Sequence, residues 1–105
     1  MSGKFFKIIL SEEAEINVFI SIISGLVVDF VVKLILNING NVFEVVRYDS
    51  GHECPHKDIL KPDGALDRKV WYESLDNQQA LDMAVKDLKE NHHFYIERFK
   101  RWAKR

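Results

Sequence analysis

The chain has 105 residues, of which 47% are hydrophobic and 30% charged, and its formal net charge at pH 7 is −1. This length allows one domain with a buried core and is too short for two, so we expect a single domain over residues 1–105. The apolar content excludes a disordered chain. The single cysteine excludes an intramolecular disulfide framework and favours a reducing, cytoplasmic setting.

The first forty residues predict strands joined by tight turns. Residues 4–10 form a candidate short strand, residues 16–23 are rich in β-branched side chains, and residues 27–38 alternate along two faces. Ser24-Gly25 and Asn39-Gly40 are tight-turn pairs, and the second is the strongest hairpin signal in the chain. Charged residues interrupt this apolar stretch, so the pattern favours a sheet over a bilayer span and predicts no membrane partner.

The next strand, expected at residues 42–49, returns beside the previous one. Strict alternation along it would place four side chains on one face: Phe43, Val45, Arg47 and Asp49. Shorter strands are expected around residues 57–60 and 70–72, on either side of a turn at residues 62–64. Short connections make successive strands antiparallel neighbours, so the predicted sheet is an antiparallel β-meander.

A long helix is expected to follow the strands. Asp76 is a candidate N-cap with Gln79 three residues later, and apolar residues then recur at steps of three and four. A helix over residues 77–103 would be about 40 Å long. The predicted fold class is therefore α+β, an antiparallel β-meander sheet followed by one long C-terminal amphipathic helix that packs on it.

The far end of this helix is aromatic and basic. If the helix is longer than the sheet, its aromatic side chains need a second copy of the chain to cover them, which predicts a homodimer. The residues concerned are Phe94, Tyr95, Phe99 and Trp102. Five cations also crowd this end, namely Arg98, Lys100, Arg101, Lys104 and Arg105. They can face phosphate groups, and they also complement the negative end of a helix dipole.

The densest chemistry lies in residues 47–58. Cleavage of RNA by its own 2′-hydroxyl needs a base, an acid and a cation that stabilises the charge on phosphorus. Histidine titrates near neutrality, so His52 and His56 are the candidate acid–base pair. Arg47 is the candidate electrostatic stabiliser. Three further candidates complete the predicted catalytic set: Asp49 or Asp58 as the orienting carboxylate, and Tyr48 as a phosphate ligand or proton donor.

Two other interpretations of this segment remain open. If the chain after Gly51 is extended, alternate side chains share a face and offer ligands suited to zinc: His52, Cys54, His56 and Asp58. Structural zinc sites normally take ligands from two separated clusters, so the sequence leaves metal binding undecided and predicts no cofactor. In the third interpretation, Asp49 and Ser50 only satisfy backbone donors in a turn, without catalysis.

The run Arg47-Tyr48-Asp49, followed by His52 and then by Pro55-His56-Lys57, resembles the TumE-like proteins, small toxin components of prokaryotic toxin–antitoxin pairs. The resemblance covers the middle third of the chain. It implies a protein that acts on RNA or translation and is neutralised by an antitoxin-like partner protein. The leading hypothesis is thus a toxin-type protein that acts on RNA, as a ribonuclease-like enzyme if it is an enzyme. The alternative is a non-catalytic dimeric interaction module that uses its C-terminal aromatic and basic helix.

Overall fold

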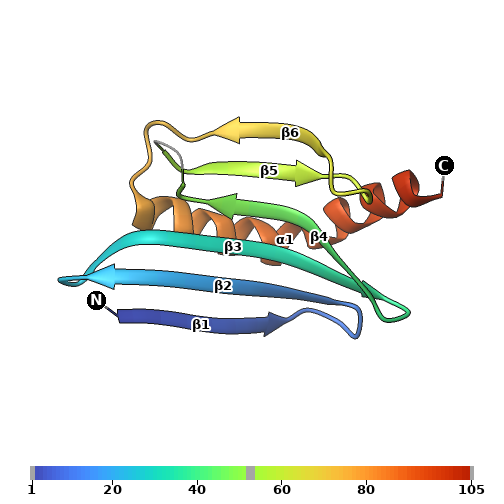
Figure 1. Cartoon of the computed structure of the whole chain (residues 1–105), viewed down its shortest axis with the longest axis horizontal. Coiled ribbons are helices and arrows are strands. Elements are labelled where there is room, and N and C mark those ends of the chain that lie inside the picture. Colours follow the sequence, from blue (N-terminus) through green and yellow to red (C-terminus); the bar gives the residue numbers. More distant parts are fainter. Residues whose placement is uncertain (1, 52–53, 105) are drawn as a thin grey trace.

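The computed structural model describes residues 2–51 and 54–104 (Figure 1). The elements in chain order are β1 (Ser2–Ile9), β2 (Ala14–Ile23), β3 (Leu26–Ile38), β4 (Asn41–Asp49), β5 (His56–Leu60), β6 (Leu66–Trp71) and α1 (Asn77–Ala103). All strands lie in one sheet in the order β1-β2-β3-β4-β5-β6, and every neighbouring pair is antiparallel. The predicted α+β fold, a meander followed by one C-terminal helix, is confirmed.

The two predicted hairpins form because their turn residues accept left-handed backbone angles. Asn39 and Gly40 have φ values of 53° and 84°, and Ser24 and Gly25 have φ values of 50° and 77°. Positive φ at both central residues is the signature of a type I′ turn, whose twist matches that of the flanking strands. Both turns are therefore specified locally by the sequence.

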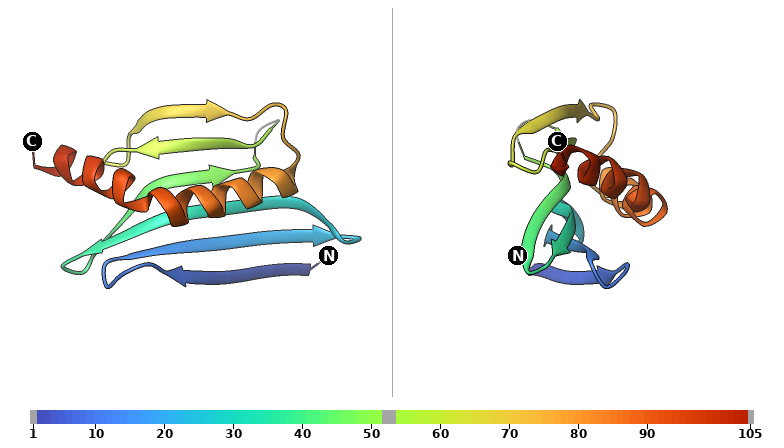
Figure 2. Two further views of the ribbon diagram at one scale, coloured as in Figure 1. Left: turned by 180° about the vertical axis from the view of Figure 1, so that it is seen from behind. Right: turned by 90° about the vertical axis from the view of Figure 1, so that its right-hand side faces the viewer.

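The helix α1 packs on one face of the sheet, mainly over β3 and β4 (Figure 2). We call this side the helix face and the other side the open face. The apolar positions of β3 that point to the helix are fully buried, as their alternation predicts: Phe30, Val32, Leu34 and Leu36. They meet the buried positions of α1, which recur at helical spacing: Ala80, Leu81, Ala84, Leu88 and Phe99. This contact is the core of the domain.

The predicted alternation along β4 is wrong in its first half because the strand contains a bulge. Leu34 pairs with Val46 and Ile35 with Glu44, so Val45 has no partner opposite it. An extra residue reverses the face of everything before it. Phe43 therefore lies on the helix face, where its ring meets that of Phe99 at 5.5 Å.

The sheet is as long as the helix, contrary to the expectation that the helix extends beyond it. The thirteen residues of β3 extend about 43 Å at 3.3 Å per residue, which matches the length of the 27-residue helix. Phe99 is consequently 1% exposed inside the chain itself, and Tyr95 is half-buried. The expectation that both need a second copy to cover them is wrong, and Phe94, at 71% exposure, is the aromatic residue of α1 that stands in solvent.

Within residues 2–51 and 54–104, no helix combines the length and the apolar character needed to cross a membrane.

Candidate functional site

Four of the predicted site residues come together on the open face. Arg47 lies opposite Asp58, and Asp49 lies opposite His56, on the neighbouring strands β4 and β5. The Arg47 Nε donates to Asp49 Oδ2 at 3.0 Å, and His56 Nε2 is 3.8 Å from Asp58 Oδ2. These four candidate residues are therefore neighbours in the structure, and their catalytic roles stay a prediction.

Asp49 is held as a carboxylate by its surroundings. Burial raises the pKa of this carboxyl, but hydrogen bonds from the Gly51 backbone N–H and from Arg47 outweigh it, so the pKa is lowered overall. The Gly51 N–H donates to Asp49 Oδ1 at 2.6 Å, and Ser50 Oγ accepts from the Phe30 N–H at 2.9 Å. Asp49 and Ser50 thus satisfy backbone donors at the end of β4, as the structural interpretation expected.

His56 is almost completely buried, with 2% of its surface exposed. Its Nδ1 lies 3.3 Å from the Cys54 carbonyl oxygen, which can only accept a hydrogen bond. Its ring lies 5.1 Å from that of Trp71. A substrate reaches this imidazole only if neighbouring side chains move. His52, the predicted partner in acid–base chemistry, lies outside the described residues.

The metal-ligand set expected from an extended segment is only partly formed. β5 begins at His56, and Cys54 lies in a bend before it, so the predicted line of alternating ligands does not include Cys54. Among the described residues, no group of three or more His, Cys, Asp or Glu side chains is placed to hold a metal ion. His52 is not one of the described residues.

Tyr48 lies on the helix face, away from the other predicted site residues. Its hydroxyl donates to Asp87 Oδ2 of α1 at 2.6 Å, and the hydroxyl of Tyr95 donates to the same oxygen at 2.6 Å. Burial raises the pKa of Tyr48, and the hydrogen bond to Asp87 adds to that effect. Tyr48 is thus buried and bound to Asp87 on the face of the sheet opposite Arg47 and Asp49, and its role as a phosphate ligand or proton donor stays a prediction.

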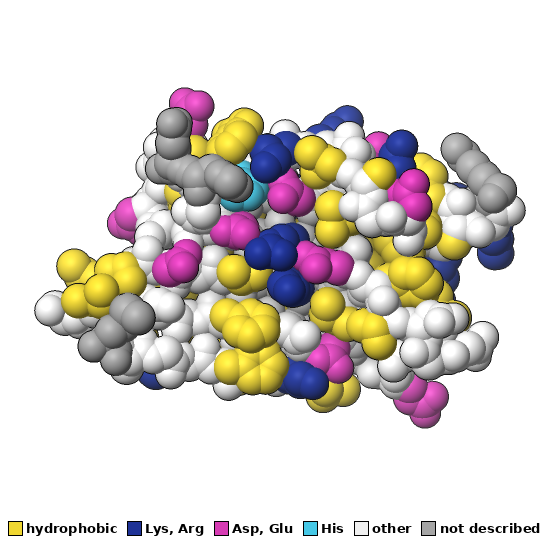
Figure 3. Space-filling model, viewed as in Figure 1, with side chains coloured by type: hydrophobic (Ala, Val, Ile, Leu, Met, Phe, Trp, Pro, Cys, Tyr) yellow, Lys and Arg dark blue, Asp and Glu magenta, His cyan; other side chains and the backbone are white. Residues whose placement is uncertain are grey.

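The open face is electrically balanced. Ion pairs run across it from Lys33 to Glu44 at 3.8 Å, from Arg47 to Glu44 at 3.6 Å and from Lys69 to Asp58 at 3.3 Å. Lys or Arg side chains lie directly beside Asp or Glu side chains over the middle of this face (Figure 3). Cations that are already paired attract an added polyanion weakly.

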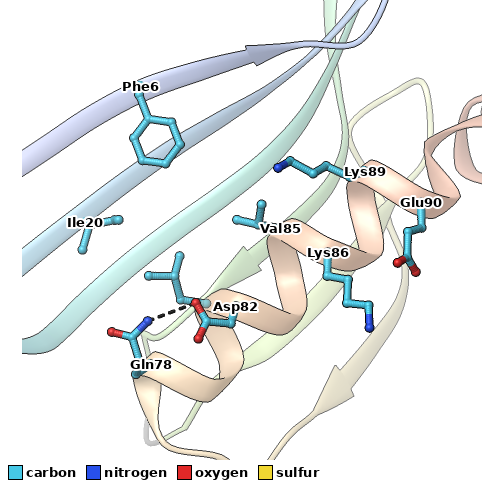
Figure 4. Close-up of a pocket in the computed structure, with 9 residues that line it drawn as sticks. Phe6, Ile20, Gln78, Asp82, Val85, Lys86, Lys89 and Glu90 are labelled. Atoms are coloured by element: carbon cyan, nitrogen blue, oxygen red, sulfur yellow. Dashed lines mark hydrogen bonds between the residues drawn. The ribbon is translucent and has the colours of Figure 1, made fainter.

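Two grooves flank α1 on the helix face because one helix cannot cover six strands. The groove toward β1 and β2 holds about 530 Å³ and has an apolar floor that includes Phe6, Ile20 and Val85. Figure 4 shows Phe6 and Ile20 extending from the strands toward the helix, with Lys89 reaching back over the groove and Lys86 and Glu90 turned away from it. We call this the apolar groove.

The groove on the other side of α1, toward β5 and β6, is cationic. It holds about 360 Å³, and its lining residues are Lys57, Ile59, Arg68, Asp87, Asn91, Phe94, Tyr95 and Arg98. Three features distinguish it: three cations line it, the one carboxylate among its described lining residues already accepts from two tyrosine hydroxyls, and the exposed ring of Phe94 also lines it. We call this the cationic groove.

None of the three cations is bound to a carboxylate in the described part of the chain. Lys57 Nζ donates to the Tyr95 hydroxyl at 3.2 Å. The Arg98 guanidinium lies over the rings of Trp102 at 5.4 Å and Tyr95 at 5.8 Å, and its buried Nε has no hydrogen-bond partner among the described residues. Stacking occupies the faces of the guanidinium and leaves its N–H edge for an acceptor.

Asp87 lines the cationic groove and connects α1 to the sheet through its hydrogen bond from Tyr48 of β4. Burial raises the pKa of its carboxyl, but hydrogen bonds from Tyr48, Tyr95 and Asn91 outweigh it, and Lys57 adds a favourable charge, so the pKa is lowered. Its negative charge is therefore shared among several donors inside the protein.

Sequence reasoning identified only part of the cationic groove. Arg98 was singled out in the basic helix end, whereas Lys57 stood inside the candidate segment without a role. Arg68 was missed, and Phe94 was expected only as an exposed aromatic residue that a second copy would cover. The signal that could have found Arg68 is strand alternation along residues 66–71, because every second side chain faces the helix and Arg68 lies opposite Ile59, whose side chain is on the helix face.

Comparisons with known proteins identify one relationship. A family model described as a domain of unknown function, DUF7718, matches residues 1–105. Neither the curated proteins nor the solved structures gave a match. The resemblance to TumE-like toxins accordingly stays a prediction. Because the family model spans the whole chain, the protein belongs to the DUF7718 family.

Proposed function

We propose that the protein binds single-stranded RNA in the cationic groove between α1 and β5–β6. The observation that carries this proposal is the convergence of Lys57, Arg68 and Arg98, from three different elements, beside the exposed ring of Phe94. Proteins that bind single strands combine a positively charged groove for the backbone with aromatic rings on which bases stack. RNA as the target is what the resemblance to TumE-like toxins implies.

The balance of charges favours this groove over the open face. On the open face, Lys33, Arg47 and Lys69 are each within 4 Å of a carboxylate, so a phosphate there must compete with an existing partner. In the cationic groove, Asp87 is the single lining carboxylate, and its Oδ2 already accepts two short hydrogen bonds. Three cations against one occupied carboxylate leave a net attraction for an anion.

The shape of the groove suits one or two nucleotides of an unpaired strand. Its volume of about 360 Å³ is at the lower end of small-molecule sites. Phe94 is 71% exposed and lies four residues before Arg98, so both sit on one side of α1. A phosphate at Arg98 and Arg68 would therefore place an adjacent base within reach of the Phe94 ring.

Binding can be measured by fluorescence anisotropy of a labelled 12-nucleotide single-stranded RNA. Arg68→Ala is the main variant, because Arg68 is exposed and its removal does not disturb the core. Lys69→Ala is the matched control, since Lys69 is the next residue but faces Asp58 on the open face. We expect Arg68→Ala to weaken binding several-fold and Lys69→Ala to leave it unchanged. Equal losses in both variants, or no binding by the wild type, would contradict the proposal.

Two further measurements sharpen the same test. Phe94→Ala should weaken binding by about 1–3 kcal/mol if a base stacks on the ring. The plot of log K against log salt concentration should have a slope of roughly −2 for three contacts, and the slope should become shallower by about 0.7 in Arg68→Ala. The same sequence made as DNA tests whether the 2′-hydroxyl contributes.

Cleavage of the bound RNA is a separate prediction. The candidate acid–base pair is His52 and His56, and His56 lies on the face of the sheet opposite the cationic groove. RNA degradation by purified protein, compared with His52→Ala and His56→Ala, tests this pair directly. Loss of cleavage in both variants with unchanged RNA affinity would support catalysis on the open face, and equal cleavage in all three proteins would remove the pair.

A further inference from the structure

The two edges of the sheet differ in how open they are to another strand. β6 is six residues long and carries three consecutive charged residues, Asp67, Arg68 and Lys69. β1 is eight residues long and pairs with β2 in unbroken register from Ser2 to Ile9. Charged, short edges resist strand addition, whereas long regular edges invite it.

Apolar side chains surround the β1 edge on both faces. Phe5, 51% exposed, packs against Phe19 of β2 on the open face, with tilted rings whose centroids are 4.6 Å apart. Phe6, 43% exposed, lies on the helix face in the apolar groove beside Ile20 (Figure 4). Ile9 closes the strand at 70% exposure. The apolar surface therefore continues around the edge from one face to the other, which is unusual for an edge in contact with water.

We propose that β1 pairs with β1 of a second copy of this chain, in antiparallel orientation about a twofold axis perpendicular to the sheet. The two six-stranded sheets then form one continuous twelve-stranded sheet. This symmetry makes the interface self-complementary, because each copy supplies the same strand to the other. It also places both helices on the same side of the combined sheet.

The charges on β1 are compatible with this pairing. Residues directly opposite each other in an antiparallel pair share a face of the sheet. Lys4 and Lys7 are three positions apart and so lie on opposite faces, which means that they cannot face each other across the twofold axis. Lys7 is also 3.4 Å from Glu15 of its own chain, so its charge is compensated.

The position of α1 leaves room for the second copy. The helix lies over β3 and β4, and its contacts with the sheet diminish toward β2. Two copies can therefore approach through β1 without collision of their helices. With the axis at the centre of β1, which runs from Ser2 to Ile9, either Phe5 or Phe6 stands directly opposite the same residue of the other copy.

The oligomeric state tests this proposal. Light scattering after size exclusion, from micromolar to millimolar concentrations, should show a mass that rises toward twice the 12.3 kDa of the chain. Phe5→Asp should weaken self-association at least about tenfold. Val42→Asp is the matched control, because Val42 is also an exposed strand residue, at 65%, but lies on β4, which β2 and β3 separate from β1, and this variant should associate as the wild type does.

Site-specific cross-linking tests the same interface without Phe5→Asp, in case that variant does not fold. In a Cys54→Ser background, Phe5→Cys and Phe6→Cys each place one thiol at the proposed axis, and mild oxidation should give a covalent dimer in at least one of them. Val42→Cys should stay monomeric. A mass of 12.3 kDa at all concentrations, a dimer that Phe5→Asp leaves intact, or cross-linking at Val42→Cys alone would each overturn the proposal.

Discussion

Asp87 is the residue on which the helix, the sheet and the cationic groove converge. It lies on α1, accepts hydrogen bonds from Tyr48 of β4 and Tyr95 of α1, and also accepts from the Asn91 side-chain amide at 2.8 Å. Asp87 is partly buried, and such donors compensate for the hydration that its carboxylate loses in the fold. The position of the cationic groove therefore depends on one carboxylate inside the fold.

This network predicts how stability responds to acid. The folded-state pKa of Asp87 lies below its ordinary value of 3.8, so ionised Asp87 stabilises the folded state. That contribution is complete above about pH 4 and is lost as the pH falls through the folded pKa. Asp87→Asn should cost about 1–3 kcal/mol at pH 7, because an amide oxygen accepts less strongly than a carboxylate.

Urea unfolding at pH 7 and at pH 3 measures this effect. The loss of stability between the two pH values should be smaller in Asp87→Asn than in the wild type, although Asp49, whose pKa is also lowered, keeps part of the acid dependence. Asp82→Asn is the control, since Asp82 is exposed on the same helix and pairs only with the Gln78 side chain. An unchanged acid dependence in Asp87→Asn would show that the network does not stabilise the fold.

At the scale of elements, the start of α1 depends on a capping box. The Gln79 N–H donates to Asp76 Oδ1 at 2.8 Å, and the Asp76 N–H donates to Gln79 Oε1 at 3.0 Å. Both residues were predicted from their spacing alone. Asp76→Ala should destabilise the protein by about 1 kcal/mol, and Glu73→Ala, which changes an exposed residue before the cap, should not. Thermal unfolding of the two variants measures the difference, and equal melting temperatures would refute the capping role.

The elements could be predicted from the sequence because their signals are local. Asn39-Gly40 specifies a turn by its own backbone preferences, and the alternation of β3 specifies which side chains face the core. The bulge at Val45 could not be predicted in this way. No glycine or proline beside Val45 signals the bulge, which arises only from the pairing of β4 with β3.

The two candidate sites also differ in whether local sequence signals could predict them. The neighbours on the open face, such as Arg47 and Asp58, could be predicted because they are close in sequence on adjoining strands. The cationic groove joins Lys57 to Arg68 across one strand pair and to Arg98 across the whole helix. Its long-range part depends on how α1 crosses the sheet, and no local pattern encodes that geometry.

At the scale of the whole molecule, the protein separates its chemistry between two faces. The open face carries paired charges and the almost completely buried His56, and the helix face carries an apolar groove and a cationic groove on either side of α1. If two copies join through β1, both cationic grooves open on the same side of the combined sheet, at its two ends. One long RNA molecule could then contact both cationic grooves, and its affinity would exceed that of an RNA too short to reach both.

The most direct test of this account is an NMR titration of the ¹⁵N-labelled protein with the 12-nucleotide RNA, followed through the backbone amides. RNA binding in the cationic groove predicts the largest shifts around Lys57, Arg68, Phe94 and Arg98, with the amides of Arg47 and Asp58 changing little. Shifts centred on the open-face residues, or none above those caused by added salt, would contradict it.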